Sequence, residues 1–193
     1  KNIRHLSLAE IETFFAELGE KKFRAKQVYE WLWQKGALSF ADMTNLSKEL
    51  RQKLGDSFTL PALAVDATQY SADGTVKSRF RTHEGHLVEG VLIPTDDRKT
   101  ACVSSQIGCS LSCKFCATGY IDRKRNLNYD EIYDEVVLIN QQSERVYEKK
   151  LTNIVFMGMG EPLLNYKNVL KAIEKITSPE GLGMSPRRIT VST

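Results

Sequence analysis

Three of the four cysteines in this 193-residue chain, Cys109, Cys113 and Cys116, lie in one short stretch, the cysteine loop (residues 109–116). Several soft thiolates on one loop are typical of an iron–sulfur cluster or a zinc site. A cluster of four irons has four ligand positions, so three cysteines leave one iron open to a small molecule. Zinc usually takes paired CxxC motifs or a histidine pair, and neither is present. The pattern favours a reactive cluster over the alternative of three buried thiols.

A second candidate site is the glycine turn (residues 158–162), which follows an apolar run predicted as a strand over 151–157. Glycines such as Gly160 let a backbone approach a ligand closely. The carboxylate of Glu161 is suited to receive an ammonium group at the end of a strand. An ordinary strand-to-helix turn has the same pattern, so both interpretations stay open.

Glu89 lies between Leu87 and Val91 on one face of a predicted strand, which is an unusual place for a carboxylate. Apolar neighbours would raise its proton affinity and make it a base. The alternative is a cross-strand ion pair with Arg79 or Arg81.

Cys102 lies on a predicted strand over 100–107 that leads into the cysteine loop. Alternation places it on one face with Ser104 and Gln106, and this small polar face is expected to leave room for ligands. A small buried hydrophobe is the other interpretation of Cys102.

The elements that must position these residues fall into three parts. Residues 1–58 show helical periodicity and caps, and we call them the helical module. Its basic residues are either solvated surface or an RNA contact. Residues 59–99 alternate as a β-hairpin connecting segment. Residues 100–193 read as alternating strands and helices, which predicts a parallel sheet with ligands at the carboxyl ends of its strands.

The bulk composition adds mild constraints. The net charge is +3, which permits an RNA partner without requiring one. No apolar run approaches the roughly 18 residues of a membrane helix. Clustered free thiols without a secretory signal favour a reducing cytoplasm. The chain begins at Lys1 rather than Met, and we expect it to be a fragment.

The motifs resemble those of radical S-adenosylmethionine (SAM) enzymes, and more closely the RlmN family. The resemblance covers essentially the whole chain and is carried by residues 23–27, 102–119, 157–165 and 187–193. It includes Phe115, where the superfamily has an aromatic residue that shields the cluster. It implies an α/β fold: a partial radical SAM (βα) barrel over 100–193, preceded by the helical module as an RNA-binding domain and by the hairpin segment.

The resemblance also implies residue roles. The [4Fe-4S] ligands would be Cys109, Cys113 and Cys116. The SAM contacts would be Gly160, Glu161 and Ser192. Glu89 matches the proton acceptor of the family. Cys102 matches the cysteine that releases the product by forming a disulfide with a methyl-carrying cysteine.

The activity implied is methylation of carbon 2 of adenosine in 23S rRNA and tRNA, with two SAM molecules and an electron donor for the cluster. The methyl-carrying cysteine of the family lies beyond Thr193, so we expect this chain not to complete methyl transfer. Two alternatives stay open: a Cfr-type enzyme that methylates carbon 8, and a non-enzymatic RNA-binding module with a structural zinc.

Overall fold

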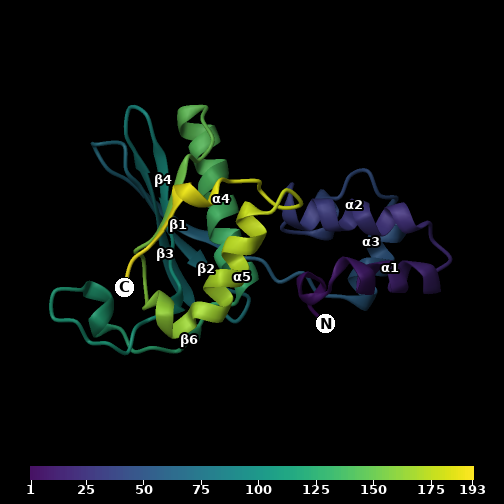
Figure 1. Cartoon of the computed structure of the whole chain (residues 1–193), viewed down its shortest axis with the longest axis horizontal. Helices are drawn as coiled ribbons and strands as arrows, with labels where there is room; N and C mark the ends of the chain where they lie inside the picture. The colour runs from purple at the N-terminus through teal and green to yellow at the C-terminus, as the bar shows by residue number, and fades with distance from the viewer.

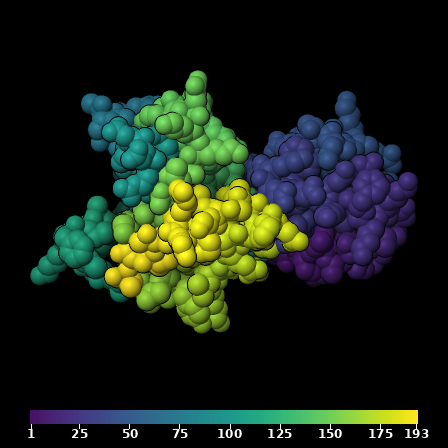
Figure 2. All heavy atoms as spheres, turned by 45° about the horizontal axis from the view of Figure 1, so that its top comes forward, coloured from purple at the N-terminus to yellow at the C-terminus, as the bar shows by residue number.

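The computed structural model describes all 193 residues. The helical module forms a bundle at one end of the molecule (Figure 1), and its atoms form the purple and blue lobe in Figure 2. The Ser7 side chain accepts a hydrogen bond from the Glu10 backbone N–H, and the Glu10 side chain accepts one from the Ser7 backbone N–H. This capping box begins the first helix, as the helical caps predicted for residues 1–58 require. The helices of this module are α1 (Leu8–Glu17), α2 (Lys22–Trp33) and α3 (Lys48–Ser57), with the short 3-10 helices η1 (Ile3–His5) and η2 (Phe40–Asp42).

The rest of the chain is built on a six-stranded sheet with the order β1-β2-β3-β4-β7-β8. The strands are β1 (Ala64–Tyr70), β2 (Val76–Arg81), β3 (Leu87–Pro94), β4 (Lys99–Cys102), β7 (Asn153–Phe156) and β8 (Ile189–Val191). The first four pair antiparallel, whereas β4, β7 and β8 run parallel. The hairpin segment therefore continues directly into the parallel strands through β3 and β4. The division of the chain at residues 59–99 stays a prediction.

Two long helices, α4 (Tyr129–Tyr147) and α5 (Tyr166–Thr177), lie together against one face of this sheet (Figure 1). In β2 the residues alternate strictly between buried and exposed, as the period of two predicts. Phe80 of β2 and Ile139 of α4 both close around Gly90, where an added Cβ would be 2.8 and 2.9 Å from them. We call the opposite side, which carries Lys77 and Glu89, the open face of the sheet.

The predicted strand over 100–107 is interrupted. β4 ends at Cys102, and after residues 103–105 the chain forms β5 (Gln106–Ile107), which pairs with β6 (Arg125–Asn126) in a separate two-stranded sheet. Ser104 and Gln106 are both fully buried. The expectation that they form a small polar face with room for ligands is therefore wrong, because their polar atoms bind neighbouring segments of the protein.

The helical module is fixed against α4 by a buried ion pair. Arg4 Nη1 lies 2.6 Å from Asp134 Oδ1, and both side chains are inaccessible to solvent. Asp134 also accepts a hydrogen bond of 3.0 Å from the Leu63 backbone N–H, and Arg4 donates one of 2.8 Å to the Ala37 carbonyl. Burial raises the pKa of Asp134 to about 6, while Arg4 acts in the opposite direction.

None of the helices is both long and apolar enough to cross a lipid bilayer.

Candidate functional site

The cysteine loop lies between β5 and β6, in a segment that projects away from the sheet (Figure 1). Cys116 N–H donates to the Cys113 carbonyl at 3.0 Å, so these two cysteines share one tight turn. The turn is closed by the short helix η3 (Ala117–Tyr120). A Cβ added to Gly119 would be 2.8 Å from the Cys113 carbonyl oxygen, so only glycine fits at this approach.

The donors around the thiols suit an iron–sulfur cluster. The Leu111 backbone N–H donates to Cys109 Sγ at 3.5 Å. Hydrogen bonds from the backbone of Gly119 and Thr118 lower the pKa of the Cys116 thiol, which favours the thiolate that binds metals. Hydrogen bonds to sulfur are also a known means of tuning such clusters.

The three thiols lie on one loop, but they are not arranged as the ligands of one metal site. No group of three or more Cys, His, Asp or Glu side chains in the structure is placed to hold a metal ion. The loop is also open to solvent, since the Phe115 side chain next to Cys116 is 94% exposed. The residues present fit a three-cysteine cluster in ligand type and number, and binding requires the loop to draw the three sulfur atoms together.

The glycine turn connects β7 to the short helix η4 (Pro162–Asn165). Gly160 has a φ of +91°, and a Cβ there would be 2.4 Å from Gln106 Cβ, so the turn needs glycine for both conformation and space. The Glu161 backbone N–H donates to Gln106 Oε1 at 2.9 Å, and its carboxylate caps η4 by accepting from Leu163 at 2.9 Å. Glu161 thus serves the ordinary turn as well, and its contact with SAM stays a prediction.

The parallel strands bring the predicted cofactor residues to one edge of the sheet. Cys102 pairs with Val155 of β7, and Val155 pairs with Thr190 of β8. The carboxyl ends of the three strands therefore lie side by side, and they lead into residues 103–107, the glycine turn and Ser192 respectively. Ser192 is exposed at this edge. Ligands of open α/β sheets bind at such an edge.

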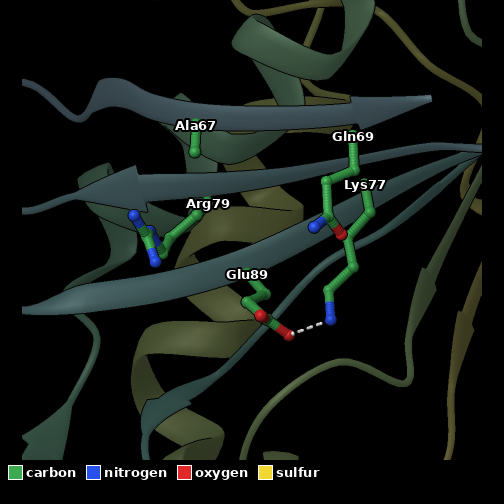
Figure 3. A pocket seen from close by; sticks show the side chains of 5 residues that line it. All are labelled: Ala67, Gln69, Lys77, Arg79 and Glu89. Atoms are coloured by element: carbon green, nitrogen blue, oxygen red, sulfur yellow. Dashed lines mark ion pairs between the residues drawn. The ribbon is translucent and has the colours of Figure 1, made fainter.

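Glu89 lies on the open face, where its carboxylate is 2.8 Å from Lys77 Nζ (Figure 3). The Glu89 side chain is 43% exposed, so the prediction that apolar neighbours surround it is wrong. The alternative of a cross-strand ion pair is correct in kind but not in partner, because Arg79 and Arg81 both bind Asp66 instead. The pair borders a small pocket lined by Ala67, Gln69, Lys77, Arg79 and Glu89 (Figure 3).

Cys102 shares the open face with Glu89, because it lies opposite Val91, two residues further along β3. Burial raises the pKa of the Cys102 thiol, and the nearby Glu135 carboxyl adds to the effect. All four cysteines are free thiols, so the disulfide implied for Cys102 is not supported by this structure.

Sequence reasoning missed Glu135, a fully buried carboxyl on α4. Burial raises its pKa well above the ordinary value. The signal was present in the sequence, because Glu135 follows Ile132 by three residues and precedes Ile139 by four, within the buried stripe of the helix.

Comparisons with known proteins support this description. The family model "Ribosomal RNA large subunit methyltransferase N-terminal domain" matches residues 1–60, and that of the "Radical SAM superfamily" matches residues 103–193. A "Probable dual-specificity RNA methyltransferase RlmN" from Cytophaga hutchinsonii is 61% identical over the whole chain, which covers 53% of that protein. The "Dual-specificity RNA methyltransferase RlmN" from Geotalea uraniireducens is 47% identical, with 54% of its length covered. The chain is therefore similar to RlmN proteins over its whole length.

A solved structure shows a similarity of the same extent. The "radical SAM methyltransferase from Sphaerobacter thermophilus" superposes on the whole chain with a TM-score of 0.88 and 39% identity, and the match covers 56% of that protein. The predicted α/β fold with a partial radical SAM barrel is therefore confirmed. The chain spans about half the length of the RlmN relatives it matches.

Proposed function

We propose that this protein is a radical SAM enzyme that methylates carbon 2 of adenosine in 23S rRNA and tRNA. One observation carries the proposal: the carboxyl ends of three parallel strands lie side by side. These ends lead to the cysteine loop, the glycine turn and Ser192, and they lie beside the open face that bears Glu89 and Cys102. The similarity to radical SAM proteins and to RlmN supports the same chemistry.

In this proposal Cys109, Cys113 and Cys116 hold a [4Fe-4S] cluster. The cluster and SAM, when bound, supply the radical chemistry that an electrophilic ring carbon requires. The turn backbone at Gly160 lets the cofactor approach closely, and the Glu161 carboxylate is suited to its ammonium group. Ser192 offers a hydroxyl at the same edge.

The open face supplies the proton chemistry. Glu89 is proposed to accept the ring proton, and the Lys77 ammonium at 2.8 Å orients its carboxylate. Cys102 is proposed as the thiol that releases the product. Because burial raises its pKa, Cys102 is protonated at neutral pH and has to lose that proton before it can attack as a thiolate.

RNA is the proposed partner of the helical module. A groove of about 460 Å³ between η2 and α3 combines an aromatic wall, Phe40, with two cations, Lys48 and Arg51. Neither cation has a carboxylate partner. Arg51 donates one hydrogen bond of 2.8 Å to the Ala41 carbonyl, and its Nε has no hydrogen-bond partner. Cations without a carboxylate partner beside an aromatic ring suit a phosphate and a stacked base. We also propose that the enzyme acts in the cytoplasm, where these RNAs are modified. An electron donor is the second proposed partner, because the cluster has to be reduced.

Anaerobic reconstitution tests the proposal. We expect the chain to bind about four irons and sulfides, with a brown chromophore whose electron paramagnetic resonance signal changes when SAM is added. Replacing Cys109, Cys113 or Cys116 by Ala should abolish iron binding, whereas Cys102→Ala, the matched control, should keep it. Stoichiometric zinc without sulfide would instead support a structural zinc module.

The position of methylation has its own test. Nucleoside analysis of 23S rRNA and tRNA, methylated by a protein that contains this chain together with the methyl-carrying cysteine of the family, is expected to give 2-methyladenosine. A product of 8-methyladenosine would contradict the proposal and support the Cfr-type alternative.

A further inference from the structure

Ser104 joins two parts of the proposed site through one hydroxyl group. Its side chain is fully buried in the segment between β4 and β5. The hydroxyl donates a hydrogen bond of 2.6 Å to the Glu89 carbonyl and accepts one of 2.8 Å from the Met159 backbone N–H. One side chain therefore connects the strand of the proposed proton acceptor to the glycine turn.

The glycine turn is pressed against this segment. A Cβ added to Gly158 would be 2.6 Å from Ser104 Oγ and 2.7 Å from the Val103 carbonyl oxygen. The backbone N–H groups of Ser105 and Gln106 both donate to the Met159 carbonyl, at 2.8 and 3.2 Å. Because the two segments are in direct contact, a shift of Ser104 displaces the turn.

Glu135 holds Ser104 from the helix side. Its Oε2 accepts a hydrogen bond of 2.8 Å from the Ser104 backbone N–H, while Oε1 has no partner in the structure. Burying a carboxyl with one oxygen unpaired is unfavourable for folding. A purely apolar residue at this place on α4 would fill the core but leave the Ser104 N–H unpaired.

We propose that Ser104, held by Glu135, is a positioning residue that fixes the glycine turn relative to the strand of Glu89. This inference rests on the proposed function, since it concerns the residues assigned there to SAM and to the proton. Ser104 touches neither ligand in this proposal. It acts by keeping Glu161 and Glu89 at a constant separation while both engage their ligands.

The decisive variant is Ser104→Ala, which removes the hydroxyl without adding volume and leaves the Met159 N–H and the Glu89 carbonyl unpaired. Ser78→Ala is the matched control, because Ser78 is also fully buried and its hydroxyl accepts a hydrogen bond of 2.6 Å from Gln142. Ser78 lies on β2, and its hydroxyl makes no hydrogen bond to the glycine turn. Both variants are expected to lower the Tm by similar amounts.

Two readouts separate positioning from general stability. The first is the Kd of SAM for the reconstituted chain, which we expect Ser104→Ala to raise by about tenfold, the effect of one or two lost hydrogen bonds, while Ser78→Ala leaves it unchanged. The second is hydrogen exchange of the Glu161 amide without cluster or SAM. Its acceptor, Gln106 Oε1 at 2.9 Å, is not altered by the substitution, so faster exchange in Ser104→Ala alone reports a loosened turn.

Glu135 provides a conservative rescue. Glu135→Gln keeps an oxygen that can accept from the Ser104 N–H, and it is expected to bind SAM like the unaltered chain. Glu135→Leu removes the acceptor and is expected to resemble Ser104→Ala in both readouts.

The outcomes distinguish this inference from the proposed function. If the unaltered chain binds SAM and Ser104→Ala binds it equally well with unchanged Glu161 exchange, the positioning role is wrong and the proposed function stands. If the unaltered chain does not bind SAM, the proposed function fails. In that case the exchange measurement still decides whether Ser104 fixes the turn.

Discussion

Removing the positive charge from the buried pair between the helical module and α4 should destabilise the protein in a pH-dependent way. Arg4→Met keeps most of the length of the side chain but leaves the Asp134 carboxylate in the core without its cation. Arg4 and Asp134 are both inaccessible to solvent and are 2.6 Å apart. Breaking such a pair from one side typically costs about 3–5 kcal/mol, because an uncompensated buried charge is left.

The sign of the pH dependence follows from Asp134. Its pKa is raised from 3.8 to about 6 by burial, so the folded protein binds this proton more tightly than the unfolded chain. Stability from this group is therefore highest below pH 4 and falls by roughly 3 kcal/mol as the pH rises to about 6. Arg4 lowers the pKa of Asp134, so its removal raises that pKa further and extends the fall to higher pH.

Urea unfolding at pH 5 and pH 8 measures the effect. We expect Arg4→Met to lose about 3–5 kcal/mol at pH 8 and clearly less at pH 5, where the carboxyl takes up a proton. The double variant Arg4→Met with Asp134→Asn should recover much of the loss at pH 8, because Asn keeps an acceptor for the Leu63 N–H without a charge. A loss below about 1 kcal/mol at pH 8, or an equal loss at both pH values, would refute the reasoning.

Three further predictions concern the proposed site. Gly119→Ala should cut iron incorporation severely, because its Cβ would be 2.8 Å from the Cys113 carbonyl oxygen, and iron content equal to the unaltered chain would contradict this. Replacing Lys48 and Arg51 by Ala should weaken RNA binding by about tenfold in fluorescence anisotropy at low salt and reduce the salt dependence. Lys53→Ala is the control, since Lys53 is paired with Glu49 at 3.0 Å, and an equal effect in the control would remove the groove as the contact. At pH 8 iodoacetamide should alkylate Cys102 more slowly than a fully exposed cysteine, since burial raises the pKa of the Cys102 thiol.

The sequence was most informative where one local pattern determines one local structure. The Ser7 capping box, the alternation of β2 and the carboxyl-end turn after β7 were all predictable, because each depends on residues close together in the chain. The family motifs also identified the cysteine loop and the glycine turn. None of these patterns contains information on which distant side chains will meet.

The errors arose from such distant contacts. The partner of Glu89 is Lys77, which reaches it diagonally, whereas Arg79, the residue directly opposite in the register, is taken by Asp66 of β1. The sequence patterns did not identify strand β1. Asp66 could therefore not be recognised as a competing partner for Arg79. The break after β4 was missed for a similar reason, since the pairing of β5 with β6 spans the whole cysteine loop.

This break in the strand explains why the proposed site can form at all. A continuous strand would have used the backbone groups of Ser104 and Ser105 in the sheet ladder. Instead, Ser104 N–H is free to bind Glu135, and Ser105 N–H binds the Met159 carbonyl. The Ser105 carbonyl accepts from Leu127 and from the Asn165 side chain, at 3.0 and 2.8 Å. By leaving the sheet, this short segment contacts α4, the glycine turn and the chain that returns from the cysteine loop, so its geometry is determined by the elements that it must align.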